Sequence, residues 1–236
     1  MFAVKNLTAN DISPVIQRIN WESGAVYDYY DDNIDITATD NNGFTVYNYY
    51  VKNKYDQVFK CLSNNNGAPS TSEPYFQPGS YGTNNIYTGP DGYQWKYIYT
   101  VDIGSKVKFM DTNWLPVPVK SFSPNPLLWS AGVGNIDVVN VLNGGSGYDP
   151  SNSAITVVAA GDGTGFAATA NVAGGSIQNI VVTAPGTNYT FANVSIQSTS
   201  GSGVVLESPV SPTGGHGSDP MSELGCAHVM YTVEFN

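Results

Sequence analysis

The clearest pattern of hydrophobic and polar positions lies in the first half of the chain and has the period of a β-strand. Residues Tyr93–Val101 alternate between two faces. One face carries Tyr93, Trp95, Tyr97, Tyr99 and Val101, and the other carries Gln94, Lys96, Ile98 and Thr100. Phe44–Val51 and Tyr55–Leu62 show the same kind of pattern and are separated by a short turn-like segment. We therefore predict strands over these three ranges.

Two other segments of the first half are interrupted by proline. Asn10–Ile19 predicts a short helix or an extended arm, with Asn10 or Ser13 as the cap and Pro14 at the first helical position. Trp114–Val119 has prolines at alternate positions. Because proline cannot donate a hydrogen bond to a neighbouring strand, this segment is expected to be an edge strand or a linker.

Residues 63–92 form a long polar stretch rich in Gly and Pro, which predicts a loop. Loops of this length usually bind a ligand or wrap around a partner. The aromatic residues in and near it, together with Tyr29–Tyr30 and Tyr49–Tyr50, are too many for all of them to be core. Tyrosine is enriched at protein interfaces, although sugar stacking is the rival explanation. The residues predicted to lie at an interface are Trp21, Tyr75, Phe76, Tyr81 and Tyr87.

Residues 134–210 differ in composition and contain an internal repeat. Val139–Tyr148 aligns with Ile180–Tyr189, 41 residues later, and both segments end in a glycine-containing turn followed by Tyr. Further on, Gly163–Gly165 matches Gly201–Gly203. Two copies predict a small β-sandwich or roll, because a solenoid needs at least three.

The final segment, Ala227–Phe235, predicts one more strand, which we expect to return to the sheet of the first domain. The sequence thus predicts an all-β protein with two β-sandwich-like domains, the second inserted into the first and built from two Gly-rich repeats. The first comprises 1–125 plus 213–236 and is discontinuous, aromatic and loop-rich. The second comprises 131–212 and is rich in Gly, Ala and Val.

Composition supports the strand prediction and narrows the function. Only 12% of the 236 residues are charged, whereas 25 Gly and 14 Pro interrupt the chain, which disfavours long helices. The formal net charge is −10, and no basic patch is visible, so we expect no nucleic-acid partner. No apolar run approaches the ~18 residues of a membrane span. Cys61 and Cys226 could pair, but buried reduced thiols are the favoured alternative.

The sequence offers little catalytic or metal-binding chemistry. We find no conspicuous pair of carboxylates and no nucleophile motif, and we predict no enzymatic activity, no catalytic residue and no cofactor. Gly144–Gly147 and Gly201–Gly203 resemble phosphate-binding turns, but neither a Lys nor a helix follows them. His216, Cys226 and His228 lie within thirteen residues and could bind zinc, but a core Cys beside a surface or interface His is the favoured interpretation.

An ordered set of segments resembles the baseplate wedge protein of T-even-type contractile-tailed bacteriophages, in a version similar to that of phages of cyanobacteria. These segments lie mostly in 16–120 and 213–236, on either side of the repeats. They are Ile19–Trp21, Tyr55–Cys61, Asp91–Tyr97, Trp114–Val117, Gly214–Pro220 and Glu223–Gly225.

The resemblance implies a structural protein of the virion, assembled in the host cytoplasm. It implies a β-sandwich protein that is dimeric in its wedge and binds other wedge subunits around the tail hub, with no catalysis and no cofactor. Members of this family are usually longer, so the chain ending at Asn236 is expected to be a fragment or a shortened form. Two alternatives stay open: a carbohydrate- or receptor-binding module of the tail, and a metal-dependent hydrolase.

Overall fold

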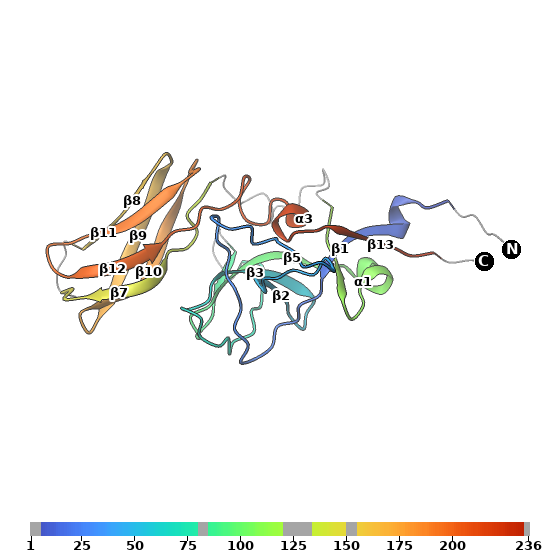
Figure 1. Ribbon diagram of the computed structural model, residues 1–236, viewed down its shortest axis with the longest axis horizontal. Helices are drawn as coiled ribbons and strands as arrows, with labels where there is room; N and C mark the ends of the chain where they lie inside the picture. The colour runs from blue at the N-terminus through green and yellow to red at the C-terminus, as the bar shows by residue number, and fades with distance from the viewer. Residues whose placement is uncertain (1–5, 80–84, 120–133, 150–154, 234–236) are drawn as a thin grey trace.

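The structure, a computed structural model, describes residues 6–79, 85–119, 134–149 and 155–233. These residues form an all-β fold of antiparallel sheets with short helices, as the sequence predicts (Figure 1). The strands are β1 (Ile12–Gln17), β2 (Tyr50–Lys52), β3 (Gln57–Ser63), β4 (Ile86–Thr88), β5 (Gln94–Thr100), β6 (Trp114–Pro116), β7 (Asn140–Ser146), β8 (Thr156–Gly161), β9 (Thr164–Ala173), β10 (Ser176–Thr187), β11 (Ala192–Gln197), β12 (Ser202–Glu207) and β13 (His228–Tyr231). The helical elements are η1 (Ala9–Asp11), α1 (Ile103–Phe109) and α3 (Pro220–Glu223).

The sheet β2-β3-β5-β4 lies in the middle of the molecule (Figure 1), and its strands β2, β3 and β5 are buried on both faces. Its register changes inside β5, because Phe59 faces Tyr97 and Val58 faces Tyr99, which leaves Ile98 as an extra residue. Such a bulge ends the strict alternation of side chains. Tyr97 therefore packs with Phe59 in one cluster, and Tyr99 packs with Val58 in another. The prediction that Tyr97 and Tyr99 share a face is wrong for this reason.

A second sheet, β13-β1-β6, lies at one end of the molecule (Figure 1). The alternative of a helix over Asn10–Ile19 is wrong. Thr8 caps only the three-residue η1, and Pro14 lies inside β1, opposite Val229. The segment is extended because β1 pairs with two strands and buries Val15 and Ile16. Trp114–Val119 is predicted to be an edge strand or a linker, and its strand β6 lies at an edge: among the described strands it pairs only with β1.

The strand β13 pairs antiparallel with β1, from Ile12 opposite Tyr231 to Val15 opposite His228. The last described strand thus joins a sheet formed by early parts of the chain, as predicted. The division into the two domains named above stays a prediction.

The strand predicted over Phe44–Val51 is limited to Tyr50–Lys52. Backbone N–H groups before it bond to side chains instead of a neighbouring strand: Asp40 accepts from Phe44, Gln17 accepts from Thr45, and Asp28 accepts from Asn48. Such side-chain acceptors compete with sheet pairing. The long loop predicted over 63–92 also needs correction, since β4 lies within it and pairs with β5.

The six strands β7 to β12 form three two-stranded sheets, and each sheet takes one strand from each repeat. The first strand of one repeat pairs with the last strand of the other, β7 with β12 and β10 with β9, and the two middle strands, β8 and β11, pair with each other. The repeat in sequence is therefore a structural repeat whose copies are interleaved. We call residues 134–210 the repeat region and the other described residues the aromatic region.

Matching tyrosines hold the two repeats together. Tyr148 of the first copy and Tyr189 of the second are both buried. The ring of Tyr148 lies over Gly201 and the ring of Tyr189 lies over Gly163, so closely that an added Cβ would lie 2.5 and 2.4 Å from ring atoms. Each tyrosine thus needs a glycine of the other copy, which explains why the repeated turns carry glycine.

The aromatic region buries more tyrosine than the sequence predicts. Tyr30, Tyr49 and Tyr50 are core residues, and Tyr29 is half-buried. Their burial is possible because each core hydroxyl donates to a backbone carbonyl: Tyr30 to Val210, Tyr49 to Glu223 and Tyr50 to Gln17.

Candidate functional site

One of the predicted interface residues belongs to the core. Phe76 is only 4% exposed and stacks on Tyr97, with ring centres 4.0 Å apart. Gln57 fixes its backbone by accepting from the Phe76 N–H and donating to the Phe76 carbonyl. The prediction that Phe76 is exposed for a partner is therefore wrong. The apolar ring fills a gap beside the central sheet although it lies in a polar stretch of sequence.

The other predicted interface residues do not form one surface of free rings. Trp21 is half-buried and donates its indole N–H to the Ser70 hydroxyl over 3.0 Å. Tyr87 is also half-buried, and Tyr75 is 40% exposed. Tyr81 lies outside the described residues. Their role at an interface stays a prediction.

A buried cluster of charged side chains lies where β3 meets the segment 216–223, which ends in α3. The Lys60 ammonium is 3.3 Å from the Glu223 carboxylate and 3.2 Å from Nδ1 of His216. The other carboxylate oxygen of Glu223 accepts from the Gly217 N–H. Lys60 also lies 3.8 Å from the centre of the Tyr30 ring, which adds a cation–π contact.

The protonation of this cluster follows from its burial and its pairing. Burial lowers the pKa of Lys60, of Lys96 opposite it on β5, and of His216. Burial would raise the pKa of Glu223, but Lys60, His216 and the backbone hold it at about 2. The carboxylate of Asp137, also buried, raises the pKa of both lysines and so partly offsets the lowering that burial causes. Glu223 is therefore ionised at neutral pH, and His216 is neutral.

The candidate metal ligands named in the sequence analysis are not brought together. His216 belongs to the buried cluster, Cys226 contacts the Val15 carbonyl through its thiol, and the ring of His228 lies 4.7 Å from that of Trp114. Within the ranges that the structure describes, no three His, Cys, Asp or Glu side chains are arranged to hold a metal ion. Cys226 and Cys61 are both free thiols.

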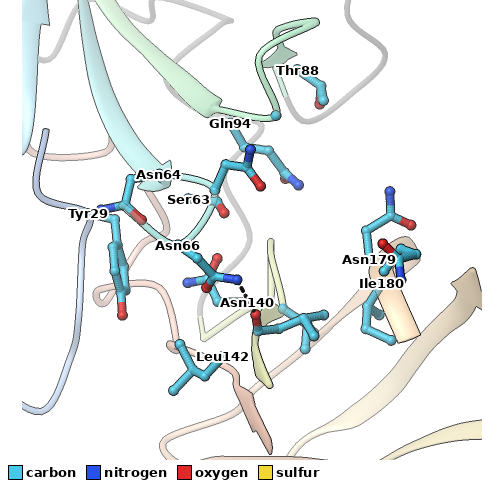
Figure 2. A pocket seen from close by; sticks show the side chains of 15 residues that line it. Tyr29, Ser63, Asn64, Asn66, Thr88, Gln94, Asn140, Leu142, Asn179 and Ile180 are labelled. Carbon is cyan, nitrogen blue, oxygen red and sulfur yellow. Dashed lines mark hydrogen bonds between the residues drawn. The ribbon is translucent and has the colours of Figure 1, made fainter. Parts of the chain in front are cut away.

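A pocket opens between the aromatic region and the repeat region (Figure 2). Its volume is about 170 Å³. One wall comes from the ends of β3 and β4 and the start of β5, and the other from β7 and β10. Its lining residues are Tyr29, Ser63, Asn64, Asn65, Asn66, Thr88, Gly92, Gln94, Val139, Asn140, Val141, Leu142, Gln178, Asn179 and Ile180.

The pocket is polar but uncharged. The Asn66 amide donates to the Val141 carbonyl over 2.8 Å, and this bond, drawn in Figure 2, links the two regions. Asn140 is 7% exposed and donates to the Leu62 carbonyl, but its Oδ1 accepts no hydrogen bond within the described part of the chain. Burial and the nearby Glu207 carboxylate raise the pKa of the Tyr29 phenol at the pocket's edge.

Sequence reasoning missed both sites. The Lys60 cluster joins residues up to 163 positions apart, and the pocket joins two regions with different sequence patterns. The one signal of the charged cluster in the sequence was Lys60, a lysine at a position of β3 that the alternating pattern predicts to be buried.

Comparisons with protein-family models, with curated protein sequences and with solved structures gave no match. Among the described residues, no helix has both the length and the apolar character needed to cross a membrane.

Proposed function

We propose that this protein is a structural subunit of a contractile phage tail baseplate, which holds neighbouring wedge subunits together through protein–protein contacts. In this proposal the protein forms a homodimer within each wedge and has no catalytic role. The fold itself is compatible with many functions, so the support has to come from particular residues.

The observation that carries the proposal is the packing of the segments that resemble the wedge protein. Tyr55–Cys61 and Asp91–Tyr97 contribute the paired strands β3 and β5. The segment 214–225 closes over the same sheet through the Lys60–Glu223 ion pair. These segments are far apart in sequence but pack together in the core. Such packing is expected if the segments resemble the wedge protein because both proteins have the same fold.

Exposed apolar side chains support a role in protein–protein contacts. Ile103 and Val107 lie one turn apart on α1 and are 81% and 80% exposed. On β13, Val229 and Tyr231 are 65% and 68% exposed. Both elements lie at the same end of the molecule (Figure 1). Apolar groups gathered on a surface commonly mark an interaction site.

The proposal is tested by mixing the purified chain with the other baseplate proteins of the same phage and measuring complex formation by size-exclusion chromatography with light scattering. Complex formation and a concentration-dependent dimer are expected. A double variant, Ile103→Asp with Val107→Asp, should keep the fold but no longer form the complex if α1 makes the contact. Val181→Asp, at an exposed valine of β10, is the matched control and should bind as the unchanged protein does.

Two results would contradict the proposal. One is a chain that stays monomeric and binds no other tail protein at any concentration tested. The other is the absence of the protein from purified virions, as measured by mass spectrometry of the separated tails.

A further inference from the structure

The pocket between the two regions carries hydrogen-bonding groups that the described chain leaves unused. The side chains of Ser63, Thr88 and Gln94 make no hydrogen bond to any described residue. Asn66 uses its amide nitrogen on Val141, and Asn179 uses its amide oxygen on Asn171, so that one half of each amide remains available. Figure 2 shows these groups around one opening.

The chemistry of the lining selects the class of ligand. All of its polar side chains are amides or hydroxyls, apart from the phenol of Tyr29, and none carries a charge. An amide both donates and accepts, which suits the neighbouring hydroxyls of a sugar. Without Lys or Arg the pocket has no charge partner for phosphate or carboxylate, and the net charge of −10 repels anions.

Apolar groups line the rest of the pocket. Leu142 and Ile180 lie beside the amides, and the ring of Tyr29 lies on the side away from Asn179 (Figure 2). Binding sites commonly combine apolar and aromatic walls with a few well-placed polar groups. The C–H faces of a sugar ring match these walls, and its hydroxyls match the amides.

The size of the pocket limits the ligand to a small unit. Its volume of about 170 Å³ is below the range of roughly 300–1,000 Å³ typical for drug-sized ligands. The unsatisfied Oδ1 of Asn140 supplies an independent sign of a missing donor, because buried acceptors normally have one. A hydroxyl of water or of a ligand would satisfy this oxygen.

We propose that this pocket binds one neutral sugar unit, such as the terminal residue of a glycan. Gln94 and Asn179 bind its hydroxyls from opposite walls, one from each region. The bound sugar therefore adds a further link between the two regions, beside the hydrogen bonds from Asn66 to Val141 and from Asn140 to Leu62. This inference does not rest on the proposed baseplate function, since a wedge subunit with or without a sugar site assembles through other surfaces.

The test uses the full chain and the methyl glycosides of glucose, galactose, mannose and N-acetylglucosamine, measured by saturation-transfer NMR and titration calorimetry. At least one of them is expected to bind. Gln94→Ala and Asn179→Ala should each weaken binding about tenfold, the effect of one lost hydrogen bond at the upper end of its usual range. Gln197→Ala, at an exposed amide of β11, is the matched control and should change nothing.

Thermal unfolding of each variant separates a lost site from a lost fold, and both pocket residues are exposed enough for the variants to fold. The proposal is overturned if no neutral glycoside binds at about 10 mM, a concentration that detects even millimolar affinity. It is also overturned if the pocket variants bind as the control does. A preference for glucuronic acid or for an extended peptide from a tail protein would overturn it too.

Discussion

Replacing Glu223 by glutamine removes the negative charge that faces Lys60 but keeps the size of the side chain and the oxygen that accepts the Gly217 N–H. The variant therefore isolates the charge of one carboxylate in the buried cluster. Lys60 is fully buried and Glu223 is 4% exposed, so water cannot replace the lost partner. The lysine must then stay charged without its partner or give up its proton.

The size of the effect can be worked out from the pKa of Glu223. This pKa is about 2 in the folded protein, against an ordinary value of 4.5. At about 1.4 kcal/mol for each pH unit, the ionised carboxylate contributes about 3 kcal/mol to the free energy of unfolding at pH 7. Breaking a buried ion pair by removing one partner commonly costs about 3–5 kcal/mol. We therefore expect Glu223→Gln to destabilise the fold by about 3 kcal/mol.

The assay is urea unfolding at pH 7, followed by the fluorescence of tryptophan, because Trp95 is buried in the sheet that carries Lys60. The midpoint should fall without a change in the slope, which reports the surface exposed on unfolding. A double variant, Lys60→Met with Glu223→Gln, should recover most of the loss, because it removes the unpaired charge and keeps the oxygen that accepts the Gly217 N–H.

The ion pair of Lys54 and Glu73 is the control, because it is open to water, with side chains 64% and 20% exposed. Lys54→Met should leave the urea midpoint nearly unchanged, because exposed pairs contribute little. If Glu223→Gln lowers the free energy of unfolding by less than about 1 kcal/mol, the reasoning is refuted, because the Glu223 carboxylate would then behave like a well-solvated charge. A double variant no more stable than the single one would refute the claim that the unpaired lysine causes the loss.

Three further predictions concern the core, the repeats and the response to acid. Phe76→Ala should cost about 3–5 kcal/mol in urea unfolding because it empties a stacked core position, whereas Tyr75→Ala next to it should have a much smaller effect. Gly163→Ala should cost about 1–3 kcal/mol, because its Cβ would lie 2.4 Å from the ring of Tyr189, and circular dichroism during heating would detect it. The depressed pKa of Glu223 supplies stability above pH 4.5 that is lost as the pH falls towards 2, so Glu223→Gln should flatten this part of the stability–pH curve.

Each of these predictions has a result that would contradict it. Equal losses for Phe76→Ala and Tyr75→Ala would mean that Phe76 is not a core residue. For the repeats, Gly104→Ala on helix α1 is the control: its Cβ would meet only the exposed Asp102 carboxylate, at 3.1 Å, so the change should cost little. A harmless Gly163→Ala would argue against the close packing of Tyr189. Parallel acid unfolding curves for the unchanged protein and Glu223→Gln would contradict the assigned pKa.

The sequence by itself determined the all-β class, the approximate positions of β3 and β5 and the existence of the repeat. These features depend on local patterns, namely alternation of side chains and glycine-rich turns, which are read within a few residues. The prolines of Trp114–Val119 limited this segment to an edge strand or a linker, and the structure shows the edge strand β6. The strand at Tyr50–Lys52 was predicted too long because the pattern does not show that backbone N–H groups bond to Asp40 and Asp28.

Only the tertiary structure decided which residues are buried and which meet. Phe76 lies in a polar stretch of sequence but is a core residue, because its ring stacks on Tyr97 of the distant strand β5. The bulge at Ile98 turns Tyr99 to the other face, and no local signal marks it. The partners of Lys60 and the two walls of the pocket come from segments far apart in the chain. Their meeting depends on how whole sheets pack, a non-local property that side-chain periodicity does not encode.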